Sequence, residues 1–267
     1  MINPTSIVTA IVAISAAAYC QWRRYHVLDN TEEIIEEKYD GNSVIKSFNA
    51  PVAKRVGGRS LFGCTSLKNI NLPKVTTIDN RAFAGCTSLK EITLPKATTI
   101  DAYAFYCCTS VEYIDLPKVT SIARFAICGC TSLEYINLPE ATSIGEWAFN
   151  GCTALEYIDL PKVTNISKNS FRQCTNLKVA YIPNATEIFN NAFYGCNNLS
   201  TVVLPDSFFN KTPKEQAAEK IRMGIPEEAQ CVRYCDYIKS SAKEMNGVIG
   251  EERFSENQKF RSNIRKR

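Results

Sequence analysis

Apolar residues recur through the middle of the chain with a period of 22 residues. In each period two apolar positions alternate with polar ones just before a proline, as Ile70 and Leu72 do before Pro73. This alternation predicts a short strand with one buried face, and the proline predicts its end because proline has no amide donor for a sheet. A second extended segment follows, of which residues 75–78 are typical. Each period is therefore predicted to form two short strands.

Seven cysteines stand one period apart and mark the phase of the repeat. They are Cys64, Cys86, Cys108, Cys130, Cys152, Cys174 and Cys196. A constant period of this length is typical of a solenoid, whose coils bury their apolar faces against their neighbours. Residues 82–83 and their equivalents are predicted to form one helical or 3₁₀ turn, because a 22-residue unit has no room for a full helix.

The array extends upstream of the first cysteine. Ile45, Phe48, Pro51 and Val56 stand at repeat positions, so residues 43–205 are predicted to form about seven or eight coils. The predicted fold is a repeat solenoid: a right-handed coil of short parallel strands and short turns, with helical caps at both ends.

The repeated string resembles the BspA-like class of leucine-rich repeats. The resemblance rests on strings of the form A-F-x-G-C-T-S-L-x-x-I-x-L-P, such as residues 148–155, and covers residues 43 to about 205. The unit here is one residue shorter than the class commonly uses. The resemblance implies a secreted or surface-attached protein of a host-associated bacterium or parasitic protozoan, which binds proteins or host matrix without catalysis. Related arrays also occur in phages.

The N-terminal segment, residues 1–28, leaves three alternatives open. Residues 2–20 carry no charge and are near the length that crosses a bilayer, with Arg23 and Arg24 directly after them. The segment is a membrane anchor that leaves the repeats on the cytoplasmic side, a helix that binds a partner, or a cleaved signal. Next, Asp29 and Glu32 fit a capping box, so residues 29–42 are predicted to form a helix that caps the first coil.

Beyond Pro205 the repeat stops. Residues 206–243 are predicted to form a helical C-terminal cap, with one helix over 214–223 and a second over 226–243. In the second helix Cys231 and Cys235 would lie on one face as packing residues, with a metal or redox role as the alternative. Residues 244–267 are predicted to be a flexible basic tail.

Charge and cysteine spacing argue against several classes of function. The formal net charge is +4, but residues 253–267 contribute +5 and residues 1–252 sum to −1. A neutral array lacks the basic stripe of a nucleic-acid groove, so no nucleic-acid partner is expected. One cysteine per coil predicts a buried column rather than a zinc site, which needs closely spaced pairs. With one histidine and no hydrolase, zincin or phosphate-loop motif, we expect no enzyme, no metal and no cofactor.

The constant phase also predicts which residues share the outer face of the first strand. Ile70 and Leu72 point inward, so Asn69 and Asn71 and their equivalents point outward. In the middle coils these positions hold tyrosines beside Asp or Asn, and interfaces favour aromatic groups with a polar tip. The predicted binding residues are Tyr113, Asp115, Tyr135, Asn137, Tyr157, Asp159 and Tyr181. The alternative is that the tyrosines stabilise the sheet by cross-strand packing.

Two further rows accompany this stripe. Glu112, Glu134 and Glu156 stand between Lys90 and Lys178 and are expected to form a solvated edge. At the opposite corner of three successive coils, Tyr103, Phe125 and Trp147 form a second aromatic patch, which is an alternative contact face.

Two functions fit these observations. The first is a non-catalytic repeat scaffold at a membrane or cell surface, which binds another protein or a surface glycan through one face and is tethered or docked by its N-terminal segment. The second is a structural component of a larger assembly, such as a phage particle, in which the apolar N-terminus and the basic tail are docking elements.

Overall fold

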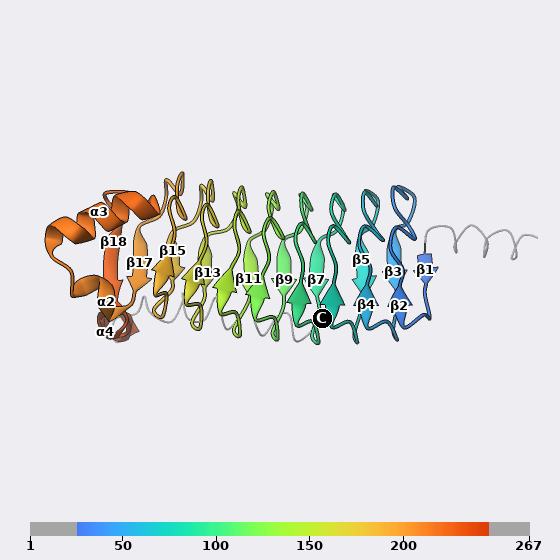
Figure 1. Ribbon diagram of the computed structural model, residues 1–267, viewed down its shortest axis with the longest axis horizontal. Coiled ribbons are helices and arrows are strands. Elements are labelled where there is room, and N and C mark those ends of the chain that lie inside the picture. The colour runs from blue at the N-terminus through green and yellow to red at the C-terminus, as the bar shows by residue number, and fades with distance from the viewer. Residues whose placement is uncertain (1–25, 246–267) are drawn as a thin grey trace, which may run out of the picture.

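The chain forms an elongated rod of stacked coils, shown in Figure 1. The structure is a computed structural model and describes residues 26–245. Strands of a first row belong to successive coils: β1 (His26–Leu28), β3 (Ser47–Asn49), β5 (Asn69–Asn71), β7 (Glu91–Thr93), β9 (Tyr113–Asp115), β11 (Tyr135–Asn137), β13 (Tyr157–Asp159), β15 (Val179–Tyr181), β17 (Thr201–Leu204) and β18 (Gln230–Arg233). Strands of a second row alternate with them: β2 (Glu33–Ile34), β4 (Arg55–Val56), β6 (Thr77–Ile78), β8 (Thr99–Ile100), β10 (Ser121–Ile122), β12 (Ser143–Ile144), β14 (Asn165–Ile166) and β16 (Glu187–Ile188).

Both rows pair in parallel with the strand of the next coil. Tyr113 pairs with Tyr135 in the first row, and Ile122 pairs with Ile144 in the second, each 22 residues apart. The second row is one continuous sheet, whereas the first is divided into β1-β3-β5, β7-β9-β11 and β13-β15-β17-β18. β11 and β13 still lie side by side along the rod (Figure 1). The predicted solenoid of short parallel strands is confirmed.

The third side of each coil is a run of hydrogen-bonded turns. Phe83 N donates to Ala104 O of the next coil at 2.9 Å, whereas Ala84 N donates back to Arg81 O within its own coil at 3.2 Å. Alternate amides thus point along the rod and build a third ladder between coils. The predicted helical or 3₁₀ turn is wrong here, because a helix would direct every amide back into its own coil.

The core consists of columns of identical or similar side chains, one per coil. Each repeat cysteine is buried, and its thiol donates to the backbone carbonyl 25 residues earlier, as Cys130 does to Phe105 O at 3.3 Å. Burial raises the pKa of Cys130 well above its ordinary value, so the thiol stays protonated. The predicted buried cysteine column is confirmed, and it acts as packing.

The predicted capping helix over residues 29–42 is wrong. This segment forms β2 followed by turns, and it adds one more coil to the array, with Ile34 fully buried 22 residues before Val56. Asp29 does not cap a helix. It accepts hydrogen bonds from Thr31, Lys38 and Tyr39, and although burial alone would raise its pKa, these bonds lower it to about 2.

The C-terminal cap mixes helices with one more strand. α2 (Asp206–Phe209) and α3 (Pro213–Met223) follow β17, and α3 begins with a capping box between Thr212 and Glu215. Its last turn closes the turn ladder, because Asn191 N and Phe193 N donate to the carbonyls of Arg222 and Met223. The helix expected over residues 214–223 therefore forms.

The second expected helix, over residues 226–243, is wrong in its first part. Residues 230–233 form β18, which pairs with β17 and satisfies the open edge of the first row. The chain then enters α4 (Tyr234–Met245). Cys231 consequently lies on a strand and is half-buried, whereas Cys235 lies at the start of α4 and is exposed, so the two do not share a helix face.

Two expectations fall on parts of the chain that the structure does not describe. The apolar residues 2–20 and the tail from residue 246 onward lie outside the described residues. Within residues 26–245, no helix has both the length and the apolar character needed to cross a bilayer.

Candidate binding face

The candidate binding face is the outer surface of the first row of strands, here called the strand face. On β9 and β11, Tyr113 and Tyr135 occupy paired positions, and their rings stack at a centroid distance of 5.5 Å and an interplanar angle of 6°. Each tyrosine alternates with a buried isoleucine, Ile114 or Ile136, which anchors the strand in the core. The alternation predicted from the sequence therefore places both rings on one outer surface.

Polar side chains line the same strands next to the tyrosines. Asn137 Nδ2 donates to Asp115 Oδ1 at 2.7 Å, so the amide bridges the two coils. Beside them runs the glutamate row, in which Glu112 pairs with Lys90 at 3.1 Å and Glu156 pairs with Lys178 at 2.9 Å. Glu134 lies between these two pairs, and among residues 27–240, whose side chains are described, no cation lies within ion-pair distance of it. The middle of the strand face is thus aromatic and acidic.

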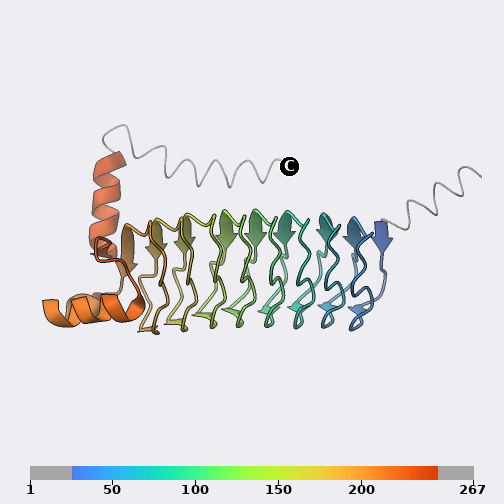
Figure 2. The ribbon, with the colours of Figure 1, turned by 90° about the horizontal axis from the view of Figure 1, so that it is seen from above.

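The C-terminal end of the strand face is contacted by the beginning of α4. Figure 2 shows this helix rising from the strand face near β17 and β18, and no other described element lies over β9 or β11. The ring of Tyr181 lies 5.9 Å from that of Tyr234 and 6.0 Å from that of Tyr237, both on α4. The seven predicted residues therefore fall into two groups: four on β9 and β11, and three on β13 and β15 near α4.

Both phenols of the second group have raised pKa values. Burial raises the pKa of Tyr157 well above 10, and the negative charge of Asp159 and the neighbouring Tyr237 add to it. Burial also raises the pKa of Tyr181, with Tyr234 as the next cause. Both phenols therefore stay protonated at every physiological pH, and their hydroxyl groups remain hydrogen-bond donors.

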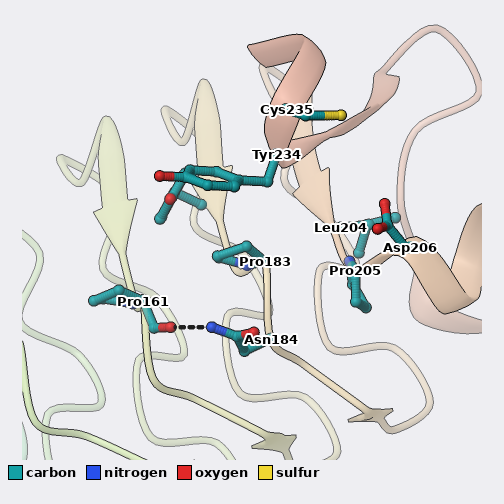
Figure 3. Close-up of a pocket in the computed structure, with 9 residues that line it drawn as sticks. Pro161, Pro183, Asn184, Leu204, Pro205, Asp206, Tyr234 and Cys235 are labelled. Atoms are coloured by element: carbon teal, nitrogen blue, oxygen red, sulfur yellow. Dashed lines mark hydrogen bonds between the residues drawn. The ribbon is translucent and has the colours of Figure 1, made fainter. Parts of the chain in front are cut away.

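A cavity of about 530 Å³ opens where α4 meets the ends of the last strands. The prolines that follow β13, β15 and β17 form part of its wall, and Asn184 Nδ2 donates to Pro161 O at 2.7 Å across it (Figure 3). Its lining residues are Pro161, Tyr181, Pro183, Asn184, Leu204, Pro205, Asp206, Tyr234 and Cys235. Prolines and tyrosine rings beside one carboxylate and one amide suit an apolar or aromatic side chain with a polar tip.

The sequence analysis missed Tyr234 and Tyr237, which extend the aromatic surface from outside the array. No sequence signal places them there, because α4 follows the last strand and lies outside the 22-residue phase. Within residues 26–245 no three potential metal-ligating side chains come together. The arrangement offers recognition by shape, aromatic contact and charge.

A sequence model of the BspA type leucine rich repeat region matches residues 12–108 and 98–212, in six copies. The chain belongs to this family. Among curated proteins no significant match is found for this BspA-type chain. Its fold is similar to that of a leucine rich cell surface protein from Faecalibacterium prausnitzii, with 26% identity and a TM-score of 0.56. That match covers 68% of this chain and 64% of that protein, so this chain spans less than two thirds of its relative.

A second solved structure, the leucine-rich repeat protein TpLRR of T. pallidum, matches the BspA-type chain with 22% identity and a TM-score of 0.47. That match covers 74% of this chain and 83% of the T. pallidum protein.

Proposed function

We propose that this BspA-type repeat protein binds another protein through the part of the strand face formed by β9 and β11. The observation that carries the proposal is the stacked pair of Tyr113 and Tyr135, set between the Asp115–Asn137 bridge and the glutamate row. Tyrosine supplies a large contact area at low conformational cost, and it is enriched in interface hot spots. The scaffold itself is that of a non-catalytic repeat family.

A protein partner fits this surface better than a glycan does. A sugar ring packs on the flat face of an aromatic ring, but Tyr113 and Tyr135 already turn one face of each ring to the other. Beside the rings lie the carboxylates of Asp115 and the glutamate row, which favour a protein partner with basic side chains. A basic side chain on the partner would complete the row at Glu134, between the two existing ion pairs.

The cavity beside α4 supplies an anchor site next to this surface. An apolar side chain of the partner would pack against Pro183, Leu204 and Tyr234, while Asp206 and Asn184 meet its polar end. Pockets that a partner's side chain fills hold many of the residues that dominate binding energy in protein interfaces. A surface location is supported by the F. prausnitzii relative, a cell surface protein, and by the family resemblance.

The test replaces both half-buried rings and compares binding with stability. The Tyr113→Ala/Tyr135→Ala variant is compared with Asn69→Ala/Asn71→Ala, which changes the same outer face near the N-terminal end of the array. A cross-linker attached at residue 137 identifies the proteins that bind the wild type. The affinity of each identified protein for the wild type and for each variant is then measured separately. The proposal expects the tyrosine variant to lose at least about tenfold in affinity, a loss typical of aromatic hot spots. Equal affinities for both variants contradict it.

A further inference from the structure

A second surface lies on the turn side of the rod, away from the strand face. There the rings of Tyr103, Phe125 and Trp147 stack in one column, with centroid distances of 4.8 Å and 5.9 Å and interplanar angles of 8° and 3°. The column continues at both ends into guanidinium groups: Arg81 lies 4.6 Å over Tyr103, and Arg172 lies 5.6 Å over Trp147. Arg124 lies 5.3 Å over Phe125. We call these six residues the arginine–aromatic column.

The backbone at this column is unfavourable for the residues it carries. Tyr103, Phe125 and Trp147 have φ values of 60°, 57° and 59°, in the left-handed region that bulky residues avoid. The same position is left-handed in the other coils too, where it holds Glu37, Arg59 and Arg81 before the aromatic residues and Asn169 and Asn191 after them. Asparagine tolerates this conformation best. Three bulky aromatic residues in succession at a left-handed position point to a role beyond the formation of the turn.

The three guanidinium groups carry charge that the chain does not neutralise. Arg55, Arg59 and Arg222 each form an ion pair with a nearby acid. In contrast, Arg81, Arg124 and Arg172 have no acid of the described residues within ion-pair distance. Stacking on the rings holds these guanidinium groups in place. Arg81 Nη1 donates one hydrogen bond, to Asn80 Oδ1 at 3.2 Å, and its charge is not neutralised by that bond.

The stacking also restricts what can bind. Phe125 lies between the rings of Tyr103 and Trp147, and Arg81 lies against Tyr103. Arg172 lies 5.6 Å from the ring centroid of Trp147 and 4.5 Å from that of Tyr194. Little free ring face is therefore left in the column. A nucleobase or a sugar needs a free ring face. Exposed ring edges carry the positive end of the aromatic quadrupole, and together with guanidinium groups they favour anions that also make apolar contacts.

We propose that the arginine–aromatic column is a docking surface for an acidic segment of a partner protein that combines carboxylates with aromatic or apolar side chains. Carboxylates meet the guanidinium groups and the ring edges, and the apolar side chains pack along the column. Arg81, Arg124 and Arg172 belong to alternate coils, so the guanidinium groups follow one another along the rod at about two strand spacings, which suits an extended chain. This surface is independent of the strand face, so either can fail without the other.

The experiment uses the fluorescence of Trp147 in a Trp22→Phe background, where it is the sole tryptophan. The probe is a random copolymer of L-glutamate and L-tyrosine, with poly-L-glutamate and heparin as comparisons. The expected result is saturable quenching by the copolymer, at least about tenfold weaker in the Arg81→Gln/Arg124→Gln/Arg172→Gln variant, and weaker at high salt. The matched control, Lys74→Gln/Lys96→Gln/Lys118→Gln, removes the same charge from exposed positions in three successive coils and is expected to bind as the wild type does.

A second variant separates binding from folding. Phe125→Asn places in this coil the residue found at the same position in two others, so it keeps the turn and is expected to melt near the wild-type temperature while it binds the copolymer more weakly. The proposal is overturned by equal loss in the lysine control, by heparin binding more tightly than the copolymer, by undiminished binding of Phe125→Asn, or by no saturable quenching.

Discussion

Tyr113, Tyr135 and Tyr157 stand in nearly the same local sequence, but Tyr157 lies in different surroundings from the other two. Glu-Tyr-Ile followed by Asp or Asn occurs in three successive coils, at residues 112–115, 134–137 and 156–159. Tyr113 and Tyr135 lie on one another, whereas Tyr157 and Tyr181 lie near the tyrosines of α4. The repeat thus decides which residues share a face. A segment outside the repeat decides which part of that face a partner can reach.

The largest expected difference is in stability. We expect the loss of a ring near α4 to lower the free energy of unfolding more than the loss of a ring on β9 or β11. Tyr157→Ala removes a ring packed below α4 and is expected to lower the free energy of unfolding by about 2 kcal/mol, toward the lower end for large-to-small changes. Tyr135→Ala removes one partner of a stacked pair and is expected to cost about 1 kcal/mol. Chemical denaturation of each variant measures the difference, with Tyr157→Phe as the control that keeps the ring. A larger loss at Tyr135 than at Tyr157 contradicts the division.

A smaller expected effect is a loss of stability at high pH that depends on the tyrosines near α4. The folded state holds the pKa of Tyr157 and Tyr181 above the ordinary value of 10, whereas the unfolded chain ionises near 10. The stability that these neutral phenols contribute is fully present below pH 10 and is lost as the pH rises from 10 toward their folded pKa values. Stability measured between pH 9 and about 11 should therefore fall, and Tyr157→Phe should reduce that fall. An unchanged slope in Tyr157→Phe would mean that Tyr157 is not held neutral by the fold.

Much of the fold follows from the period alone. Because Leu, Ile, Phe and Cys recur every 22 residues, their columns, the parallel pairing and the buried thiols can be predicted before any coordinates exist. The same period could have corrected the expectation for residues 29–42. Ile34 stands one period before Val56, and that signal outweighs the local resemblance of Asp29 and Glu32 to a capping box. In residues 29–42, stacking on the next coil therefore outweighs the local preference for a helix.

The remainder depends on contacts that no period encodes. β18 forms because β17 would otherwise leave its backbone groups open, and α4 then starts where its tyrosines meet Tyr181. The cavity lined by Pro183, Leu204 and Tyr234 arises from that junction. Likewise, the sequence shows aromatic residues at positions 103, 125 and 147, but it does not show that their backbone is left-handed and that arginines close both ends of the column.

The most direct test of the divided tyrosine stripe is the rate at which each tyrosine is nitrated by tetranitromethane, mapped by mass spectrometry of peptides. The reagent attacks tyrosinate, so the raised pKa values of Tyr157 and Tyr181 and the contacts that Tyr181 makes with α4 slow the reaction there. The account predicts that Tyr113 and Tyr135 react faster than Tyr157 and Tyr181, and that Tyr234→Ala/Tyr237→Ala speeds the reaction of the slow pair alone. Nitration of Tyr157 as fast as that of Tyr113, or rates unchanged by the α4 substitutions, would contradict it.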